Sequence, residues 1–381
     1  MNRVDVAIIG AGVTGLSTAF HLKSLGLESM AVFEDPASQV SSLLCPGMAF
    51  GGLMDNYTRI EHAYGRHIAR DVWGFSHLAF EKLVGFLNAQ GAKLRRVRRL
   101  RLLVREDELA EARQATDLLL RDGFSTRFMA GHGEFSQGIL GDRVLGLQED
   151  MEGAAVFKPE DLRRSLLTED VASKVIQRRV KRLEVGPKEV AFEAASGERW
   201  GSQMVVLAAH GGIAKLSPFF EDVLIPYADQ WHQMTVRESG CPEVVYSAHH
   251  GYEWGHIGTD TAWIGGGRFL RPMAGISQPK AEVSDKAYHY LKRGWSGLWP
   301  SCALGRAQLS RSFFGLRPCD ELPLIGPMFG ENRLLLGAGY MGLGLAAGFA
   351  AGQALAELIY HGRCFWLPRM LEPRRLRALE H

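Results

Sequence analysis

The chain has 381 residues, 46% of them hydrophobic, and its 44 basic and 42 acidic residues leave a formal net charge of +2 at pH 7. A chain of this size can bury a large core, and its length favours two domains over one. The near-neutral charge argues against DNA as a partner, because nucleic-acid-binding domains carry a clear excess of cations.

The cysteines and the two chain ends bear on the cellular compartment. The five cysteines are Cys45, Cys241, Cys302, Cys319 and Cys364. They are scattered and include no CxxC pair, so we expect no disulfide framework and a cytoplasmic protein. No signal peptide is predicted, because a strand pattern begins directly after the first residues. The apolar stretch near the C-terminus holds many glycines, Gln353 and Glu357 and matches a membrane span poorly. Peripheral contact with the inner membrane stays open.

The N-terminal segment predicts a strand, a glycine-rich turn, a helix and a second strand. An apolar run from Val4 to Ile9 precedes the turn GAGVTG, and the second strand SMAVFE closes on Glu34. In this order the elements indicate dinucleotide binding, because bare backbone admits a pyrophosphate and the helix N-terminus presents unpaired amides to it. Glu34 is expected to accept hydrogen bonds from ribose hydroxyls.

The next segment does not continue the alternation of a nicotinamide-binding domain. Its loop, DPASQVSSLLCPGMAFGGL, carries hydroxyls at Ser41 and Ser42 and an apolar, glycine-bearing part from Pro46 to Gly52. We expect this loop to line the rest of a long, folded cofactor. A helical pattern then runs from about Thr58 to Gln90. Its histidines are spaced five and ten residues apart and share no helix face, so no metal site is predicted.

An arginine-rich segment follows. The stretch KLRRVRRLRLLVRED has seven cations between Lys93 and Arg105, interleaved with apolar residues. This pattern favours a strand with a cationic outer face. Clustered arginines also suit an anionic partner such as RNA or a membrane surface. The acids from Glu106 to Glu111 weaken that second interpretation.

The middle of the chain predicts a return to the nucleotide domain and then a second domain. Helical patterns lie at 106 to 122 and from Pro159 onward, and an apolar strand from Met204 to Ala208 precedes His210. After Pro226 the sequence is rich in strand patterns up to about Phe314, which predicts a mainly antiparallel domain.

The C-terminal stretch LLLGAGYMGLGLAAGFAAG, from Leu334 to Gly352, repeats the order of strand, glycine turn and helix. No further strand ending in an acid follows it. Gly344, Gly348 and Gly352 recur every four residues and are expected to line one helix face, where bare backbone allows close packing. We therefore expect the two glycine turns to hold a single nucleotide cofactor from both ends of the chain.

With these motifs the sequence resembles the D-amino acid oxidase family of flavoproteins, which contains glycine oxidase and sarcosine oxidase. The resemblance rests on GAGVTG with Glu34, on SSLLCPGM, on VLAAHGG, and on FFGLRPCDELPLIGP followed by the second glycine turn. It implies an α/β fold in which a Rossmann-type FAD-binding domain is interleaved with a mainly antiparallel β substrate domain, as in the glutathione-reductase-like FAD fold. The implied boundaries are 1–90, 150–218 and 318–381 for FAD binding, and 91–149 and 219–317 for the substrate.

The resemblance implies FAD as a non-covalent cofactor, because no cysteine matches the covalent flavin attachment of sarcosine oxidases and Cys319 is offset. The pyrophosphate would meet Gly10, Gly12, Val13, Thr14 and Gly15. Glu34, with Asp35 beside it, would hold the ribose, and Val180 would meet the adenine. The flavin and its ribityl chain would be bordered by Ser41, Ser42, Pro46, Gly47 and Met48. The second turn would lie against the flavin ring through Gly339, Tyr340, Met341, Gly342, Leu343, Gly344 and Leu345.

The resemblance assigns Arg317, in the motif GLRP, to the substrate carboxylate, for which a guanidinium fork has the right geometry. A salt bridge to Asp320 or Glu321 is the structural alternative. Tyr340 is a further catalytic candidate. Tyr252, Trp254 and His256 are candidate walls of the substrate pocket, although aromatic residues on a strand also suit a core. Gly342 stands where glycine oxidase has a second arginine.

The implied activity is oxidation of the C–N bond of a carboxylate-bearing amino acid or secondary amine. Hydride passes to flavin N5 and water hydrolyses the resulting imine, so the protein mainly orients the substrate. Oxygen or an electron-transfer partner would reoxidise the flavin. Three alternatives stay open: a 2-hydroxy acid dehydrogenase, an oxidase for a modified tRNA base, and a flavin subunit of a larger electron-transfer complex.

Overall fold

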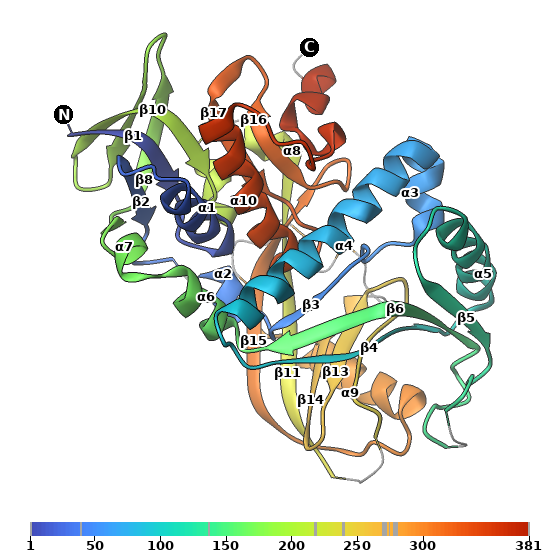
Figure 1. Cartoon of the computed structure of the whole chain (residues 1–381). Helices are drawn as coiled ribbons and strands as arrows, with labels where there is room; N and C mark the ends of the chain where they lie inside the picture. Colours follow the sequence, from blue (N-terminus) through green and yellow to red (C-terminus); the bar gives the residue numbers. More distant parts are fainter. Residues whose placement is uncertain are drawn as a thin grey trace.

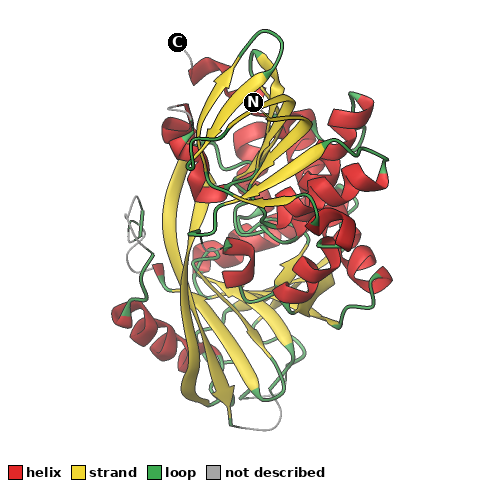
Figure 2. Cartoon of the chain, turned by 90° about the vertical axis from the view of Figure 1, so that its left-hand side faces the viewer, coloured by secondary structure: helices red, strands yellow, loops and turns green. Residues whose placement is uncertain are grey.

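The chain folds around two β-sheets (Figure 1). In this computed structural model the described residues are 2–38, 40–135, 138–216, 219–237, 241–268, 273, 275–276 and 281–379. Both sheets carry helices, and in Figure 2 most helices gather on one side of the sheet nearer the two termini. This arrangement confirms the predicted α/β class with one parallel and one mainly antiparallel sheet.

The first sheet is parallel at its centre and carries both glycine turns. Its order is β16-β17-β10-β1-β2-β7, and the hairpin of β8 and β9 extends from β10. Its strands are β1 (Asn2–Ile9), β2 (Met30–Glu34), β7 (Val175–Gln177), β8 (Val180–Val185), β9 (Val190–Ala194), β10 (Arg199–Leu207), β16 (Leu324–Met328) and β17 (Glu331–Ala338). Ile9 pairs with Leu207 and Leu207 with Leu336, so the parallel strands end together. The carboxyl edge of such a sheet is where nucleotides bind.

The second sheet is mainly antiparallel, with order β15-β11-β14-β13-β12-β4-β6-β3 and β5 beside β6. Its strands are β3 (Met48–Phe50), β4 (Leu94–Leu103), β5 (Thr126–Ala130), β6 (Gly146–Phe157), β11 (Leu224–Val236), β12 (Val244–Ala248), β13 (Glu253–Ile257), β14 (Thr261–Gly266) and β15 (Leu304–Pro318). β3 and the end of β6 lie in segments that the sequence assigns to FAD binding, yet they pair within this second sheet.

The α-helices are α1 (Val13–Ser24), α2 (Ser41–Leu44), α3 (Tyr57–Tyr64), α4 (Arg66–Ala89), α5 (Glu106–Arg121), α6 (Pro159–Leu166), α7 (Glu169–Ala172), α8 (Phe219–Val223), α9 (Asp285–Leu298) and α10 (Ala346–His361). The single helix predicted from 58 to 90 is wrong in one respect. Gly65, at φ +82°, divides it into α3 and α4, a backbone conformation that glycine adopts without a steric penalty.

Among the described residues, we find no helix with the length and apolar character needed to cross a membrane.

The helices after the two glycine turns pack directly against each other. A Cβ at Gly348 would lie 2.7 Å from Val13 Cγ1, and one at Gly352 would lie 2.5 Å from Ser17 Cβ. The Ser17 hydroxyl donates to the Phe349 carbonyl at 2.7 Å. The predicted close-packed glycine face is therefore confirmed for these two glycines. It is wrong for Gly344, which precedes α10 and would place a Cβ in open space.

Because α1 leaves no room at Gly352, we expect Gly352→Ala to lower the free energy of unfolding by about 1 to 3 kcal/mol through overpacking. Gly85→Ala is the matched control: Gly85 is an exposed helical glycine on α4, where a Cβ would have no described atom within 4 Å. The control should gain up to about 1 kcal/mol, since alanine is the better helix former. Urea unfolding of both variants measures the difference, and equal midpoints would contradict close packing at Gly352.

The expectation of no disulfide is wrong. Cys241, before β12, and Cys302, after α9, form a disulfide with their Cα atoms 5.7 Å apart. Cys45, Cys319 and Cys364 are free thiols. The bonded pair is 61 residues apart in the sequence. Only the folding of the second sheet brings the two cysteines together, and spacing alone cannot reveal such a pairing.

Candidate active site

A cavity of about 1230 Å³ lies between the carboxyl edge of the first sheet and one face of the second. The first glycine turn, Glu34, the second glycine turn and the residues of β11, β13 and β15 all contribute to its wall. A cavity of this size, at the carboxyl ends of parallel strands, suits a large nucleotide together with a small substrate.

The first glycine turn forms one end of the cavity. Gly10 has φ +113°, and a Cβ there would collide with the Ala208 carbonyl. A Cβ at Gly15 would collide with the Gly10 carbonyl. A Cβ at Gly12 would meet only Ser42 Oγ, at 3.5 Å, and would otherwise project into the cavity. Gly10 and Gly15 therefore close the turn, whereas Gly12 keeps space for a ligand.

The polar groups around this end fit a nucleotide. Val13 N, at the start of α1, donates to Ser42 Oγ at 3.1 Å, and Val13, Thr14, Ser41 and Ser42 line the cavity. The free amides of a helix N-terminus stabilise phosphate charge. Val180, the buried first residue of β8, and Asp35 lie on the same wall.

Glu34 also lies on this wall, but its carboxylate already has two partners. Arg163 Nη2 donates to one oxygen at 2.8 Å, and Gln177 Nε2 donates to the other at 2.7 Å. Arg163 Nη1 also donates to the Ala11 carbonyl at 2.6 Å. Sequence reasoning missed Arg163 because it lies on α6, 129 residues from Glu34. Arg163 fixes the carboxylate and the glycine turn together, and each carboxylate oxygen keeps a lone pair for a ribose hydroxyl.

The predicted loop residues divide between the wall and the packing beneath it. Pro46 and Met48 line the cavity. Gly47 is not among the lining residues: at φ +70° it packs so closely on Phe157 that a Cβ would collide with the Phe157 carbonyl. Gly15 and Leu343 are likewise outside the wall of the cavity, and Leu343 is buried.

The second glycine turn meets the first inside the cavity. Gly339, Tyr340, Met341, Gly342, Gly344 and Leu345 line it. The Tyr340 hydroxyl and Thr14 Oγ1 are hydrogen-bonded at 2.8 Å. Burial raises the pKa of the Tyr340 hydroxyl, which therefore stays protonated. This contact gives the hydroxyl of Tyr340 the role of linking the two turns, so the predicted catalytic role lacks support.

Arg317, near the end of β15, lies on the wall of the same cavity. Its guanidinium is ion-paired with Glu321, which is the structural alternative that the sequence left open. Burial opposes the charge of Arg317, but Glu321 and Tyr252 outweigh it and raise its pKa. Asp320 instead accepts two hydrogen bonds from Arg375, at 2.6 and 3.0 Å. Arg317 is thus a permanent cation whose counter-ion is a partly exposed carboxylate.

Tyr252 and Trp254 line the cavity as predicted, but His256 does not. His256 lies further along β13, where its ring is 5.1 Å from that of Trp263 and its Nε2 is 3.9 Å from Glu243. Burial lowers the pKa of His256 to about 4, so the ring is neutral at pH 7. Tyr252, Trp254 and His256 alternate along the chain, as residues on one face of a strand do. The cavity reaches only as far as Trp254, however, so His256 lies outside it.

Three further residues of the cavity wall were missed by sequence reasoning: Tyr227, Asp229 and Arg268. Burial raises the pKa of Tyr227 to about 12 and also raises that of the Asp229 carboxyl, against the opposing effect of Arg268. The alternation of Tyr227 and Asp229 on β11 is a signal that the sequence offers. Arg268 follows the glycines at the end of β14. Because glycines followed by a charged residue are common in loops, the sequence gives no specific signal for Arg268.

The arginine-rich segment faces inward as well as outward. Arg99 donates to the Leu53 carbonyl at 3.3 Å, and Arg101 donates to the carbonyls of Leu53, Met54 and Asp55 at 3.5, 3.4 and 3.2 Å. Burial lowers the pKa of Arg101 to about 10. The predicted outward cationic face is therefore wrong for Arg99 and Arg101, which instead hold the loop beside the cavity.

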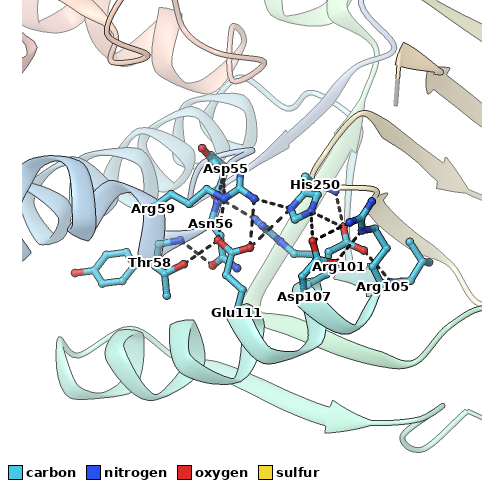
Figure 3. A network of polar contacts seen from close by, with 12 residues as sticks. Asp55, Asn56, Thr58, Arg59, Arg101, Arg105, Asp107, Glu111 and His250 are labelled. Carbon is cyan, nitrogen blue, oxygen red and sulfur yellow. Dashed lines mark hydrogen bonds and ion pairs between the residues drawn. The ribbon is translucent and has the colours of Figure 1, made fainter. Parts of the chain in front are cut away.

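Arg99 and the four remaining arginines of this segment also have acidic partners. The ion pairs are Arg95–Glu243, Arg96–Glu81, Arg98–Glu149, Arg99–Asp150 and Arg105–Asp107. Figure 3 shows how Arg101 and Arg105 join a network with Arg59, Glu111 and His250, of which Arg59 and His250 line the cavity. These arginines are already paired with acidic residues, so their charge is largely neutralised within the protein. The structure therefore lends no support to RNA or a membrane surface as a partner.

A parallel sheet that carries two glycine turns and a mainly antiparallel sheet both contribute to the wall of one cavity, an arrangement of the dinucleotide-binding class. The family model DAO, described as FAD dependent oxidoreductase, matches residues 5–358. The chain therefore belongs to the DAO family of FAD-dependent oxidoreductases, and FAD is its cofactor. The open space at Gly12 and the amides of α1 fit that cofactor.

Solved structures share this fold at low sequence identity. Glycine oxidase from Geobacillus kaustophilus has a TM-score of 0.78 and 14% identity, over 98% of this chain and 99% of that chain. L-proline dehydrogenase from P. horikoshii has 0.76 and 17%, over 99% and 98%. Iminodiacetate oxidase from Chelativorans sp. BNC1 has 0.74 and 20%, over 97% and 98%. The search of curated proteins gave no match.

Proposed function

We propose that the protein oxidises the C–N bond of an amino acid or secondary amine that carries a carboxylate, giving an imine that water hydrolyses. The observation that carries the proposal is the guanidinium of Arg317 on the wall of the cavity that also contains the nucleotide-binding turn. The names of the glycine oxidase and iminodiacetate oxidase structures support amine substrates for this fold.

We propose that FAD is held non-covalently by the residues on the cavity wall. Gly10, Gly12 and the amides at the start of α1 would hold the pyrophosphate. Glu34 would hold the ribose, Val180 the adenine, and the loop of Ser41 to Met48 the flavin, opposite the turn from Gly339 to Leu345. When bound, FAD supplies the acceptor for the two electrons of the oxidation. The division into FAD-binding segments 1–90, 150–218 and 318–381 and the substrate segments between them remains part of this proposal.

The protein's own contribution is to bind and orient the substrate. Arg317 would exchange Glu321 for the substrate carboxylate, since a guanidinium binds either carboxylate with two parallel hydrogen bonds. The rings of Tyr252 and Trp254 would exclude water and fix the position of the Cα atom. Fixed orientation of the reacting bond is the main contribution that a protein makes to chemistry carried by a cofactor.

The proposal is tested by mixing the purified flavoprotein anaerobically with amino acids and, separately, with 2-hydroxy acids. Glycine, N-methylglycine and proline should bleach the flavin absorbance and yield ammonia or an amine, or a cyclic imine for proline. Bleaching by glycolate and lactate alone would establish a 2-hydroxy acid dehydrogenase instead. Admitting air after bleaching then identifies the acceptor: rapid return of the absorbance with peroxide indicates oxygen, and a need for an added dye indicates an electron-transfer partner.

A further inference from the structure

Arg268, two residues after β14, is a cation on the cavity wall, and no ion pair of its side chain is found among the described residues. Its Cζ atom lies 4.7 Å from the ring centre of Tyr227 and 5.8 Å from that of Tyr252. Within the part of the chain that the structure describes, its buried Nη1 has no hydrogen-bond partner. A buried donor without an acceptor costs free energy, and more so when it carries charge. Such a group is expected to find its acceptor in a bound ligand.

Two acids of the cavity wall, Asp229 and Glu321, do not supply that acceptor. Asp229 is close enough to affect Arg268 electrostatically, but within the described part of the chain no ion pair joins the two side chains. Glu321 is paired with Arg317. The aromatic faces of Tyr227 and Tyr252 stabilise the cation without neutralising it.

Arg268 and Arg317 approach the same tyrosine from different directions. Arg317 interacts with the side-chain hydroxyl of Tyr252, whereas Arg268 lies over the ring. The fork of a single arginine engages both oxygens of one carboxylate and fixes it in the plane of that guanidinium. A substrate with one carboxylate, bound at Arg317, would therefore leave the buried nitrogen of Arg268 unpaired.

We propose that the cavity binds an amino or imino acid with two anionic groups, one at Arg317 and the second at Arg268. This inference rests on the proposed oxidation of an amine and specifies its substrate class. Under this proposal Arg268 sets the specificity for substrates with two anionic groups. Gly342, on the same cavity wall, has no side chain that could bind the second group.

The kinetic test compares iminodiacetate with N-methylglycine, which lacks one carboxylate, on the FAD-loaded enzyme. We expect kcat/KM to be about 100-fold higher for iminodiacetate. Arg268→Gln should lower kcat/KM for iminodiacetate by about 100-fold and change that for N-methylglycine by less than about threefold. Arg268→Lys should recover part of the loss, because it keeps the charge but not the fork. Arg306→Gln, an exposed arginine of β15 outside the cavity, is the matched control.

Binding of unreactive acids separates this inference from the proposed function. Titration of the oxidised flavoprotein with malonate or succinate, against acetate, should perturb the flavin absorbance at lower concentrations of the diacids, and Arg268→Gln should remove that preference. If no amine reduces the flavin, the proposed function fails while this titration still reports on Arg268. Equal affinity for monoacids and diacids in the unmutated enzyme, or an equal loss for both classes in Arg268→Gln, would overturn the inference.

Discussion

Gly12→Leu is expected to yield a folded protein that purifies without flavin. The cavity leaves room for a side chain at this position when no cofactor is bound, since the nearest atom to a Cβ is Ser42 Oγ at 3.5 Å. The same side chain occupies the space in which the pyrophosphate must approach the backbone. We expect the affinity for FAD to fall about 1000-fold or more, equivalent to about 4 kcal/mol. Flavin absorbance of the purified protein and titration of the apoprotein with FAD measure the change.

Two comparisons make this result specific. Gly85→Leu places the same side chain on an exposed face of α4 and should keep its flavin. Gly15→Leu should fail to fold, because a Cβ there collides with the Gly10 carbonyl. Neither Gly12→Leu nor the unmutated protein should bind a nicotinamide nucleotide. A normal flavin content in Gly12→Leu would contradict the assigned role, and so would two nucleotides bound per chain.

Arg317→Ala should keep its flavin and lose its activity toward acids. The side chain is paired with Glu321 and not with a residue of either glycine turn, so we expect the cofactor contacts to remain. Loss of a charged fork from a partly buried site should lower kcat/KM for a carboxylate substrate by about 100- to 1000-fold. Steady-state kinetics and flavin content, measured on the same preparation, separate substrate binding from cofactor binding.

The partner of Arg317 supplies the control. Glu321 occupies the guanidinium in the free protein and must be displaced by the substrate. Glu321→Gln should therefore lower KM for acids, whereas Arg317→Lys should restore little activity because a lysine lacks the fork. Unchanged kinetics of Arg317→Ala on its best acid substrate would show that the carboxylate binds elsewhere.

The parts of the site that the sequence revealed are local. The turn from Gly10 to Gly15 and the acid at the end of the next strand lie within one continuous β-α-β unit, where spacing determines geometry. The second glycine turn is likewise visible as a strand followed directly by a helix. Arg317 was found through its motif, which is also local. In each case the chemical role follows from neighbours within a few residues.

The parts that the sequence missed depend on distant pairing. Arg163 reaches Glu34 only because α6 lies beside the first turn. Arg99 and Arg101 turn inward because the loop before α3 needs donors for its carbonyls. His256 leaves the cavity with the path of β13, and Arg268 enters it after β14. The positions on β4, β13 and β14 are set by the register of the second sheet, which no short pattern in the sequence encodes.

The hydrogen bond between Thr14 and Tyr340 has a consequence for biosynthesis. It joins residues 326 positions apart, and α1 packs on a helix that begins only at Ala346. Contacts between such distant segments form late, after the chain between them has been made. During synthesis the N-terminal glycine turn is therefore present before the second glycine turn, which completes the nucleotide site. We expect flavin to enter the protein after release of the completed chain, so that a polypeptide stopped before the last glycine turn carries none.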